Sequence, residues 1–153
     1  MQYKLKNPDF RASIEDHLTR QMFMKHLGCR LTVIEPGYVE AVIDLKPEHQ
    51  QQLGLVHGGV TATIADVAAG FAGFTLVGPH EHTVTAEIKV SYFAKGRGSR
   101  LRAVGRVVKP GRMMHFCEAD VFCSDGGEET LIARATTTMA VITPASRTSE
   151  ANH

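Results

Sequence analysis

The feature that most constrains this chain is a long apolar stretch that carries a single charge. From Val60 to Val77 the only ionisable side chain is that of Asp66. Residues that are apolar on every side predict a helix buried inside the fold. A carboxylate on such a helix is costly unless it is paired or used in chemistry. Asp66 is therefore the first candidate for a functional residue.

The start of this helix offers a second candidate. His57, Gly58 and Gly59 precede the apolar stretch, and Gly78-Pro79 follows it, which predicts a helix over about 58–77. We expect the two glycines to leave backbone N–H groups free at the positive end of the helix dipole. A developing negative charge can be held there.

The rest of the chain alternates in the manner of strands. Residues 29–35 and 38–45 predict a strand pair around the Pro36-Gly37 turn, and 8–27 form a weakly periodic helical segment that ends at Gly28. Four further strands with glycine-containing turns between them are predicted at 83–94, 99–109, 112–124 and 128–143.

Together these elements predict an α+β fold in which an antiparallel sheet wraps around one long central helix, the hotdog arrangement. Small residues on the helix would let the strands approach closely. The chain of 153 residues has a size and composition typical of one soluble domain. We expect that domain over 1–143, including an N-terminal helical segment at 1–28, and a disordered polar tail over 144–153.

Composition also narrows the setting. The three cysteines, Cys29, Cys117 and Cys123, form neither a metal spacing nor an even disulfide set, which predicts reduced thiols in a cytoplasmic protein. The apolar stretch approaches membrane-spanning length, but its Gly/Ala content and central Asp66 favour burial in protein. His80-Glu81-His82 lacks a third ligand at metal spacing, so no metal site is expected.

Positive charge is concentrated in one segment. Residues 88–117 hold eight basic side chains, including Lys95 and Arg97, and no acidic one. Arg100, Arg102 and Arg106 share one face of a strand, which fits a solvated sheet surface. The alternative is a landing site for a phosphate-bearing ligand. The net charge of +1 argues against a nucleic acid partner.

The stretch from Gln51 to Gly59, followed by Asp66, resembles the PaaI-like acyl-CoA thioesterases of the hotdog superfamily. In that family a His-Gly-Gly motif opens the central helix and an acid lies nine positions after the histidine, as Asp66 does here. The resemblance covers roughly residues 22–143. It implies hydrolysis of acyl-CoA to a carboxylic acid and free coenzyme A, with no cofactor.

The resemblance also implies roles for individual residues. The N–H of Gly58 matches the oxyanion donor, and Asp66 matches the catalytic carboxylate, as general base or as nucleophile. Gln51 stands where many PaaI-like members carry an asparagine. Glutamine is typical of the hydroxybenzoyl-CoA branch, whose acid is usually glutamate, so the substrate subclass stays open.

Further residues of this chain match substrate-binding positions. His57 and Gly59 are expected to shape the loop at the helix start, Thr85 to lie near the attacking water, and Arg112 to contact coenzyme A phosphates. The alternative for Gln51 is a solvated loop amide, for Thr85 an ordinary strand residue, and for Arg112 a plain surface arginine. Ile64, Phe71 and Phe74 would suit an aromatic or a medium aliphatic acyl group.

Members of this superfamily assemble as dimers with one continuous sheet, and the site lies between subunits. The resemblance therefore implies a homo-oligomer, a dimer or a homotetrameric dimer of dimers. Gln51, His57 and Gly58 would come from one chain, and Asp66 and Thr85 from the other. One alternative is a non-catalytic acyl-CoA-binding or ligand-sensing module, which would not need Asp66. Another is a hotdog dehydratase or hydratase.

Overall fold

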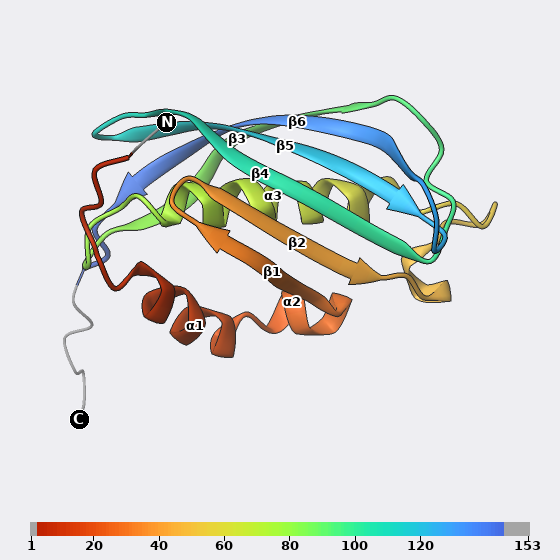
Figure 1. The fold of residues 1–153 in the computed structure, drawn as a ribbon, viewed down its shortest axis with the longest axis horizontal. Helices are drawn as coiled ribbons and strands as arrows, with labels where there is room; N and C mark the ends of the chain where they lie inside the picture. The colour runs from red at the N-terminus through yellow and green to blue at the C-terminus, as the bar shows by residue number, and fades with distance from the viewer. Residues whose placement is uncertain (1–2, 146–153) are drawn as a thin grey trace, which may run out of the picture.

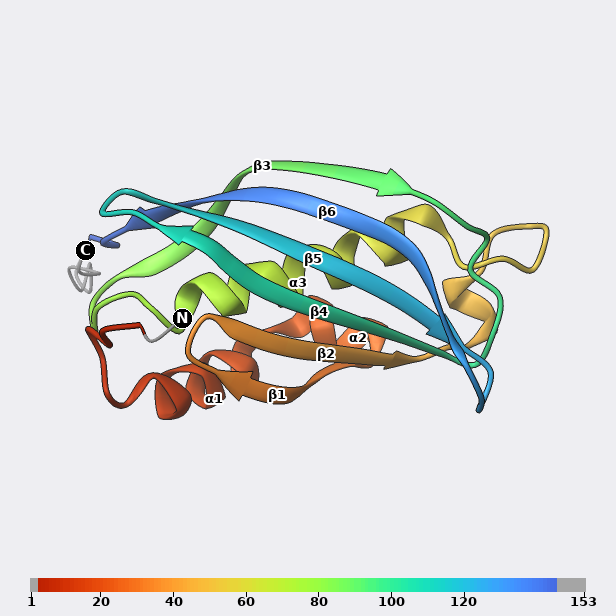
Figure 2. The same ribbon diagram turned by 45° about the horizontal axis from the view of Figure 1, so that its top comes forward.

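A curved antiparallel sheet wraps around the helix that carries Asp66, as Figures 1 and 2 show. The computed structural model describes residues 3–145. The elements, in chain order, are α1 (Phe10–Arg20), α2 (Met22–Leu27), β1 (Cys29–Glu35), β2 (Tyr38–Asp44), the short 3₁₀ turn η1 (Pro47–His49), α3 (Gly58–Phe74), β3 (His82–Tyr92), β4 (Arg100–Pro110), β5 (Met114–Ser124) and β6 (Glu129–Ile142).

The strand order across the sheet is β1-β2-β4-β5-β6-β3, with every neighbouring pair antiparallel. The hotdog prediction is confirmed, and each predicted strand is present, β1 with its predicted bounds and the others with ends within two residues of the prediction. β3 lies at one edge of the sheet, where it pairs with β6 (Figure 2). Among residues 3–145 no strand pairs with its other side.

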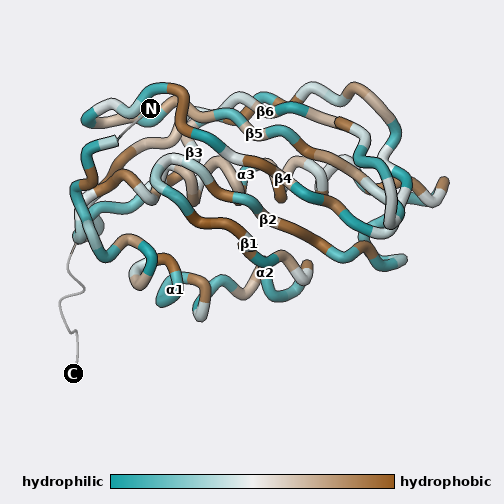
Figure 3. Tube along the Cα trace, in the orientation of Figure 1, coloured by the Kyte–Doolittle hydropathy of each residue, from teal (hydrophilic) through white to brown (hydrophobic). Residues whose placement is uncertain are grey.

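Small residues bring α3 directly onto the sheet. Ala65, Ala68, Ala69 and Ala72 are fully buried in the main core. At Gly105 of β4 an added Cβ would overlap the backbone carbonyl of Ala68, so this position has room only for glycine. Along the strands, hydrophobic residues alternate with hydrophilic ones, as Figure 3 shows. The position of α3 over the sheet is thereby closely defined.

The predicted end of α3 is wrong by three residues. The helix ends at Phe74 rather than at residue 77, before Gly78-Pro79 is reached. The hydroxyl of Thr75 donates to the carbonyl of Ala72 and accepts from the backbone N–H of Gly37. Thr75 is fully buried, so these bonds to both sides satisfy its side chain at the helix end. Leu76 and Val77 follow in a tight turn.

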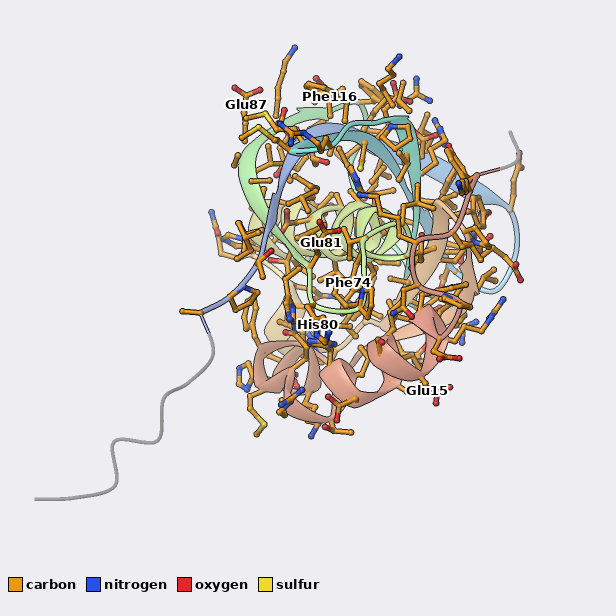
Figure 4. The ribbon with its side chains drawn as sticks, turned by 90° about the vertical axis from the view of Figure 1, so that its left-hand side faces the viewer. Glu15, Phe74, His80, Glu81, Glu87 and Phe116 are labelled. Carbon is orange, nitrogen blue, oxygen red and sulfur yellow. The ribbon has the colours of Figure 1, made fainter. Side chains whose placement is uncertain are left out.

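The N-terminal segment forms two helices instead of one. The break at Gln21 lets α1 place Phe10 and Ile14 against Phe74 and Val77. α2 then turns Met24 into the main core. Both helices lie on the side of α3 that the sheet leaves open, and Figure 4 shows Phe74 between α3 and these helices. None of the helices within residues 3–145 combines the length and apolar character needed to cross a bilayer.

The predicted polar tail, 144–153, is described only in part. Of the polar tail, Pro144 and Ala145 are exposed and irregular, and residues 146–153 lie outside the described residues.

Cys29, Cys117 and Cys123 are all buried free thiols. Burial raises the pKa of Cys29 to about 11 and that of Cys117 to about 12, so both remain protonated at neutral pH.

Candidate active site

The carboxylate of Asp66 contacts Thr85, the strand residue that the family resemblance places near the attacking water. The hydroxyl of Thr85, on β3, donates a hydrogen bond of 2.7 Å to Oδ1 of Asp66. Asp66 is half-buried rather than enclosed, and it faces the edge strand β3 through Thr85. The bond orients the carboxylate and occupies one oxygen. No described residue donates to the second carboxylate oxygen, Oδ2.

The carboxylate lines a pocket with a volume of about 560 Å³, called here the larger pocket because a second one, which Arg112 lines, has about 390 Å³. One wall is the α3 face through Asp66, Gly70 and Phe74, and the opposite wall is β3 with Thr85. Residues of α1 and α2 close a further side. The predicted acyl-facing residues divide here: Phe71 and Phe74 line the pocket, whereas Ile64 is fully buried in the core.

The start of α3 is built around His57. Its ring Nδ1 accepts a hydrogen bond of 2.9 Å from the N–H of Gly59, and His57 is the N-cap residue of the helix. The expectation that both glycines leave free N–H groups is therefore wrong for Gly59. The N–H of Gly58 donates to no described residue. Gly58 alone keeps the donor that an oxyanion would need.

Two residues around this helix start were not identified from the sequence. The hydroxyl of Tyr92, at the end of β3, donates a hydrogen bond of 2.7 Å to the carbonyl of Gly58. The backbone N–H of His57 donates to the carbonyl of His49, 2.9 Å away. The alternation of β3 puts Thr85 and Tyr92 on the helix side, but only after the bulge between Thr85 and Glu87 is counted. That bulge has no sequence signal.

Gln51 lies in the tight loop that precedes the helix. The side-chain oxygen of Gln51 accepts from the backbone N–H of Leu53, and the backbone N–H of Gln51 donates to the carbonyl of Leu55. Gly54, with a φ of 72°, completes the turn. The NH₂ group of the Gln51 amide has no acceptor among the described residues.

One chain does not bring the predicted residues together. Asp66 follows Gly58 by eight positions, which places it about 12 Å further along the helix axis and about 80° around it. The attacking oxygen and the carbonyl of one thioester span only a few ångströms. His57 and Gly58 therefore form one group at the helix start, with Gln51 in the loop that leads to it, and Asp66 and Thr85 form a second group in the pocket.

Arg112 lies far from both groups. It follows β4 in the hairpin at the C-terminal end of α3, where it lines a smaller pocket of about 390 Å³ with Leu76 and His115. Figure 1 shows this hairpin and the start of α3 at opposite ends of the molecule. The helix between them is about 25 Å long, so Arg112 does not reach the Gly58 of its own chain.

Most of the strand arginines are neutralised by acids from other parts of the chain. The outer face of the sheet carries the ion pairs Arg100–Asp44, Arg102–Glu40, Arg102–Glu129, Arg106–Glu118, Arg106–Asp120 and Arg134–Asp120. The solvated-face interpretation holds for these residues. Lys95 and Arg97 differ, because both are exposed and no ion pair joins either of them to an acid within residues 3–145. Gly96 between them accepts a hydrogen bond from the backbone N–H of Val56, just before the start of α3.

A histidine pair lies at the far end of the larger pocket. The His17 and His82 rings meet edge-to-face with centroids 4.7 Å apart, and both contact the Phe74 ring. The sequence interpretation put His82 in a loop, but it begins β3. His17 lies on α1, so nothing in the sequence joins the two residues. Within residues 3–145, no group of three His, Cys, Asp or Glu side chains is arranged to hold a metal.

Comparisons with known proteins agree on one family. The family model described as the thioesterase superfamily matches residues 53–130, more than half of the chain. The proofreading thioesterase EntH of Klebsiella pneumoniae is 27% identical over 101 residues, which cover 66% of this chain and 74% of EntH. The putative esterase PA1618 of Pseudomonas aeruginosa is 28% identical over 79% of this chain and 82% of its own length.

Solved structures extend the likeness to almost the whole fold. A thioesterase family protein from Silicibacter pomeroyi superposes with a TM-score of 0.86 at 32% identity, covering 88% of this chain and 99% of that protein. A mutant of the phenylacetic acid degradation protein PaaI from Thermus thermophilus gives a TM-score of 0.68 at 27% identity, over 78% of this chain and 98% of PaaI. The chain is a member of the thioesterase superfamily, with the hotdog fold of its PaaI-like branch.

Proposed function

We propose that the protein hydrolyses acyl-CoA thioesters and that Asp66 delivers the oxygen nucleophile to the thioester carbonyl. The observation that carries this proposal is the setting of Asp66. It is the only charged side chain on α3, it is oriented by Thr85, and it lines an apolar pocket. A carboxylate held in this way, with one oxygen not engaged by a described residue, suits proton abstraction or direct attack.

Both routes lead to the same products. As a general base, Asp66 removes a proton from water while the water oxygen bonds to the carbonyl carbon. The C–S bond then breaks, and the coenzyme A thiolate takes up the proton. As a nucleophile, the carboxylate displaces the thiolate and forms a mixed anhydride, which water hydrolyses. Each route consumes one water and releases a carboxylic acid and the free thiol.

The Gly58 N–H is the proposed oxyanion donor. It points out of the N-terminal end of α3, where the helix dipole favours negative charge, and no described residue accepts from it. The NH₂ of Gln51 is the second donor proposed for the carbonyl or the water. His57 holds this loop through its bond to Gly59. We assign His57 a positioning role and give it no part in proton transfer.

Because Gly58 and Asp66 of one chain are too far apart along α3, we infer that the site is completed by a second copy. The edge of β3 that does not face β6 has no strand partner in residues 3–145, and Val84, Ile88 and Tyr92 are exposed along it. An edge of this kind invites pairing with another strand. Two-fold pairing through β3 runs the two α3 helices in opposite directions and brings each helix start toward the partner copy's carboxylate.

Measuring thiol release from a panel of acyl-CoA esters tests the proposal. We expect wild-type turnover with at least one class of ester and a loss of about 10²–10⁴ in kcat for Asp66→Asn. Asparagine can still accept from Thr85, so the melting temperature and the oligomer should be unchanged. Asp125→Asn, in an exposed hairpin turn, is the matched control. Tight acyl-CoA binding without thiol release by the wild type would overturn the proposal in favour of a binding module.

A further inference from the structure

The larger pocket extends well beyond the reacting carboxylate. Asp66, Gly70 and Phe74 line it at intervals of four residues, so it follows one face of α3 for about 12 Å. Gly70 leaves the middle of this face without a side chain, and Met139 and Ile88 of the sheet lie opposite. Phe23 and Met24 of α2 close the remaining side. A slot of this shape suits the acyl part of a thioester.

The middle and the far end of the slot differ in polarity. Between the ends the lining is mainly apolar, with the Thr83 hydroxyl bonded to the carbonyl of Gly70, but at the Phe74 end the pocket is lined by His17 and His82. The Phe74 ring lies 5.0 Å from the His17 ring and 5.7 Å from the His82 ring, measured between centroids. A purely hydrocarbon acyl chain would gain nothing from two imidazoles at this point, because they present polar nitrogens to it.

The hydrogen bonding of His17 defines what the pair offers. Nδ1 of His17 lies 2.6 Å from the carbonyl oxygen of Ser13, so Nδ1 carries the proton and donates it. This leaves Nε2 as the ring nitrogen of His17 that is available to a ligand. Among residues 3–145, neither Nε2 of His17 nor a ring nitrogen of His82 has a hydrogen-bond partner.

The charge state of His82 supports the same kind of ligand. Burial, together with the nearby His17 and Arg20, lowers the pKa of His82 below its ordinary value of 6.5. His82 is therefore neutral at neutral pH and presents both a donor and an acceptor nitrogen. The end of the slot thus suits a group that both donates and accepts hydrogen bonds, as a hydroxyl does.

We propose that this slot binds the acyl group and that His17 and His82 select acyl groups with a hydroxyl at the end remote from the thioester. The inference rests on the thioesterase function proposed above, because that function places the carbonyl at Asp66. The hydroxyl can belong to a straight alkyl chain or to an aryl ring. The chemistry recognised at the pocket end is the same in both cases.

Two matched pairs of substrates test this inference. One pair is a straight-chain acyl-CoA and its terminally hydroxylated counterpart, and the other is a phenyl-substituted acyl-CoA and its ring-hydroxylated counterpart. We expect the hydroxylated member of at least one pair to have a kcat/KM about tenfold higher, as for one net hydrogen bond. The pair that shows the preference identifies the acyl class.

Variants assign the preference to the histidines. His82→Phe keeps a ring against His17 and Phe74 but removes both nitrogens, so it should abolish the preference and favour the unhydroxylated ester. His17→Phe should weaken the preference in the same direction. His80→Phe changes an exposed histidine that does not line the slot and should retain the wild-type ratio. Circular dichroism and thermal melts identify a variant that fails to fold.

Binding of the free carboxylic acids, measured by calorimetry, separates this inference from the proposed function. If no thioester is hydrolysed but the hydroxylated acid binds more tightly and His82→Phe removes the difference, the slot is correct and the enzyme proposal fails. If thioesters are hydrolysed and neither pair shows a preference, the inference is overturned. A preference that persists in both His82→Phe and His17→Phe overturns it as well.

Discussion

Tyr92 donates a hydrogen bond of 2.7 Å to the carbonyl of Gly58, so β3 anchors the start of α3 directly. The same strand supplies Thr85, which orients Asp66. Both groups of the proposed site are therefore held by one edge strand. If that edge is also the contact between two copies, the formation of the dimer and the alignment of the catalytic groups are the same event.

The bond from Tyr92 leads to the first prediction. Tyr92→Phe keeps the ring but releases the Gly58 carbonyl, so the helix start should lose its alignment. We expect kcat to fall about three- to tenfold, in line with one net hydrogen bond of about 1 kcal/mol. Steady-state kinetics and a thermal melt measure the effect. Tyr38→Phe, which removes a hydroxyl bonded to Glu40 on the outer sheet face, is the control. An equal loss of kcat in both variants would contradict a local role.

The second prediction concerns the shared site. Asp66→Asn and Gln51→Ala should each be poorly active alone. A dimer that holds one chain of each kind has one site with both wild-type groups, so an equal mixture after subunit exchange should regain about a quarter of wild-type turnover. Activity is measured before and after exchange. Mixtures that stay at the average of the two parents would place the site within one chain or remove Gln51 from it.

The third prediction concerns coenzyme A. Lys95 and Arg97 flank Gly96, which is bonded to Val56 close to the helix start. If these cations contact the substrate phosphates, the double variant Lys95→Gln/Arg97→Gln should raise KM about tenfold and leave kcat nearly unchanged. Thioesters without the nucleotide should show no such rise. Lys109→Gln, an exposed cation at the other end of β4, is the control. A similar rise with the truncated thioesters would indicate altered packing.

The fourth prediction is a pH dependence of stability at Asp120. Burial alone would raise the pKa of this carboxyl, but the hydrogen bonds from Arg134 and Arg106 outweigh burial and hold the pKa below its ordinary value of 3.8. A carboxyl whose pKa is lower in the folded state stabilises the fold above the unfolded-state pKa. This stabilisation is lost as the pH falls through the folded-state pKa.

Asp120→Asn should therefore lower the free energy of unfolding by about 1–2 kcal/mol at pH near 7. The difference from wild type should shrink as the pH falls below about 3.8, because the wild-type carboxyl then becomes neutral too. Urea unfolding near pH 7 and below about pH 3.8 measures this difference in the free energy of unfolding. Asp125→Asn is the exposed control. A difference of equal size at both pH values would show that packing, and not charge, is responsible.

Features of the fold that depend on residues close together in the chain could be predicted from the sequence. An apolar run with glycines at its start predicts α3, and the turn residues between strands predict the meander. Asp66 could be selected because a lone charge on an apolar helix needs a reason. The prediction for the helix end was wrong because Thr75 takes its second partner from Gly37, which is distant in the sequence.

Features that depend on residues far apart in the chain were beyond local patterns. The basic segment contains no acid of its own, yet Asp44 pairs with Arg100 from the neighbouring strand of the sheet. His17 meets His82 only because α1 folds back over the open side of α3. The shared site that we propose depends on a strand edge that is unpaired within residues 3–145, and local patterns do not reveal such an edge.

The contact between Gly105 and Ala68 has a consequence for how this fold can acquire new substrates. Because the β4 backbone touches α3 there, the helix that carries Asp66 has no room to shift toward the sheet. The slot can then be reshaped only from its other side, where α1 and α2 are short and separate. Variation within residues 10–27 would therefore alter the slot while Asp66 stays in place, so directed evolution of this chain should begin with those two helices.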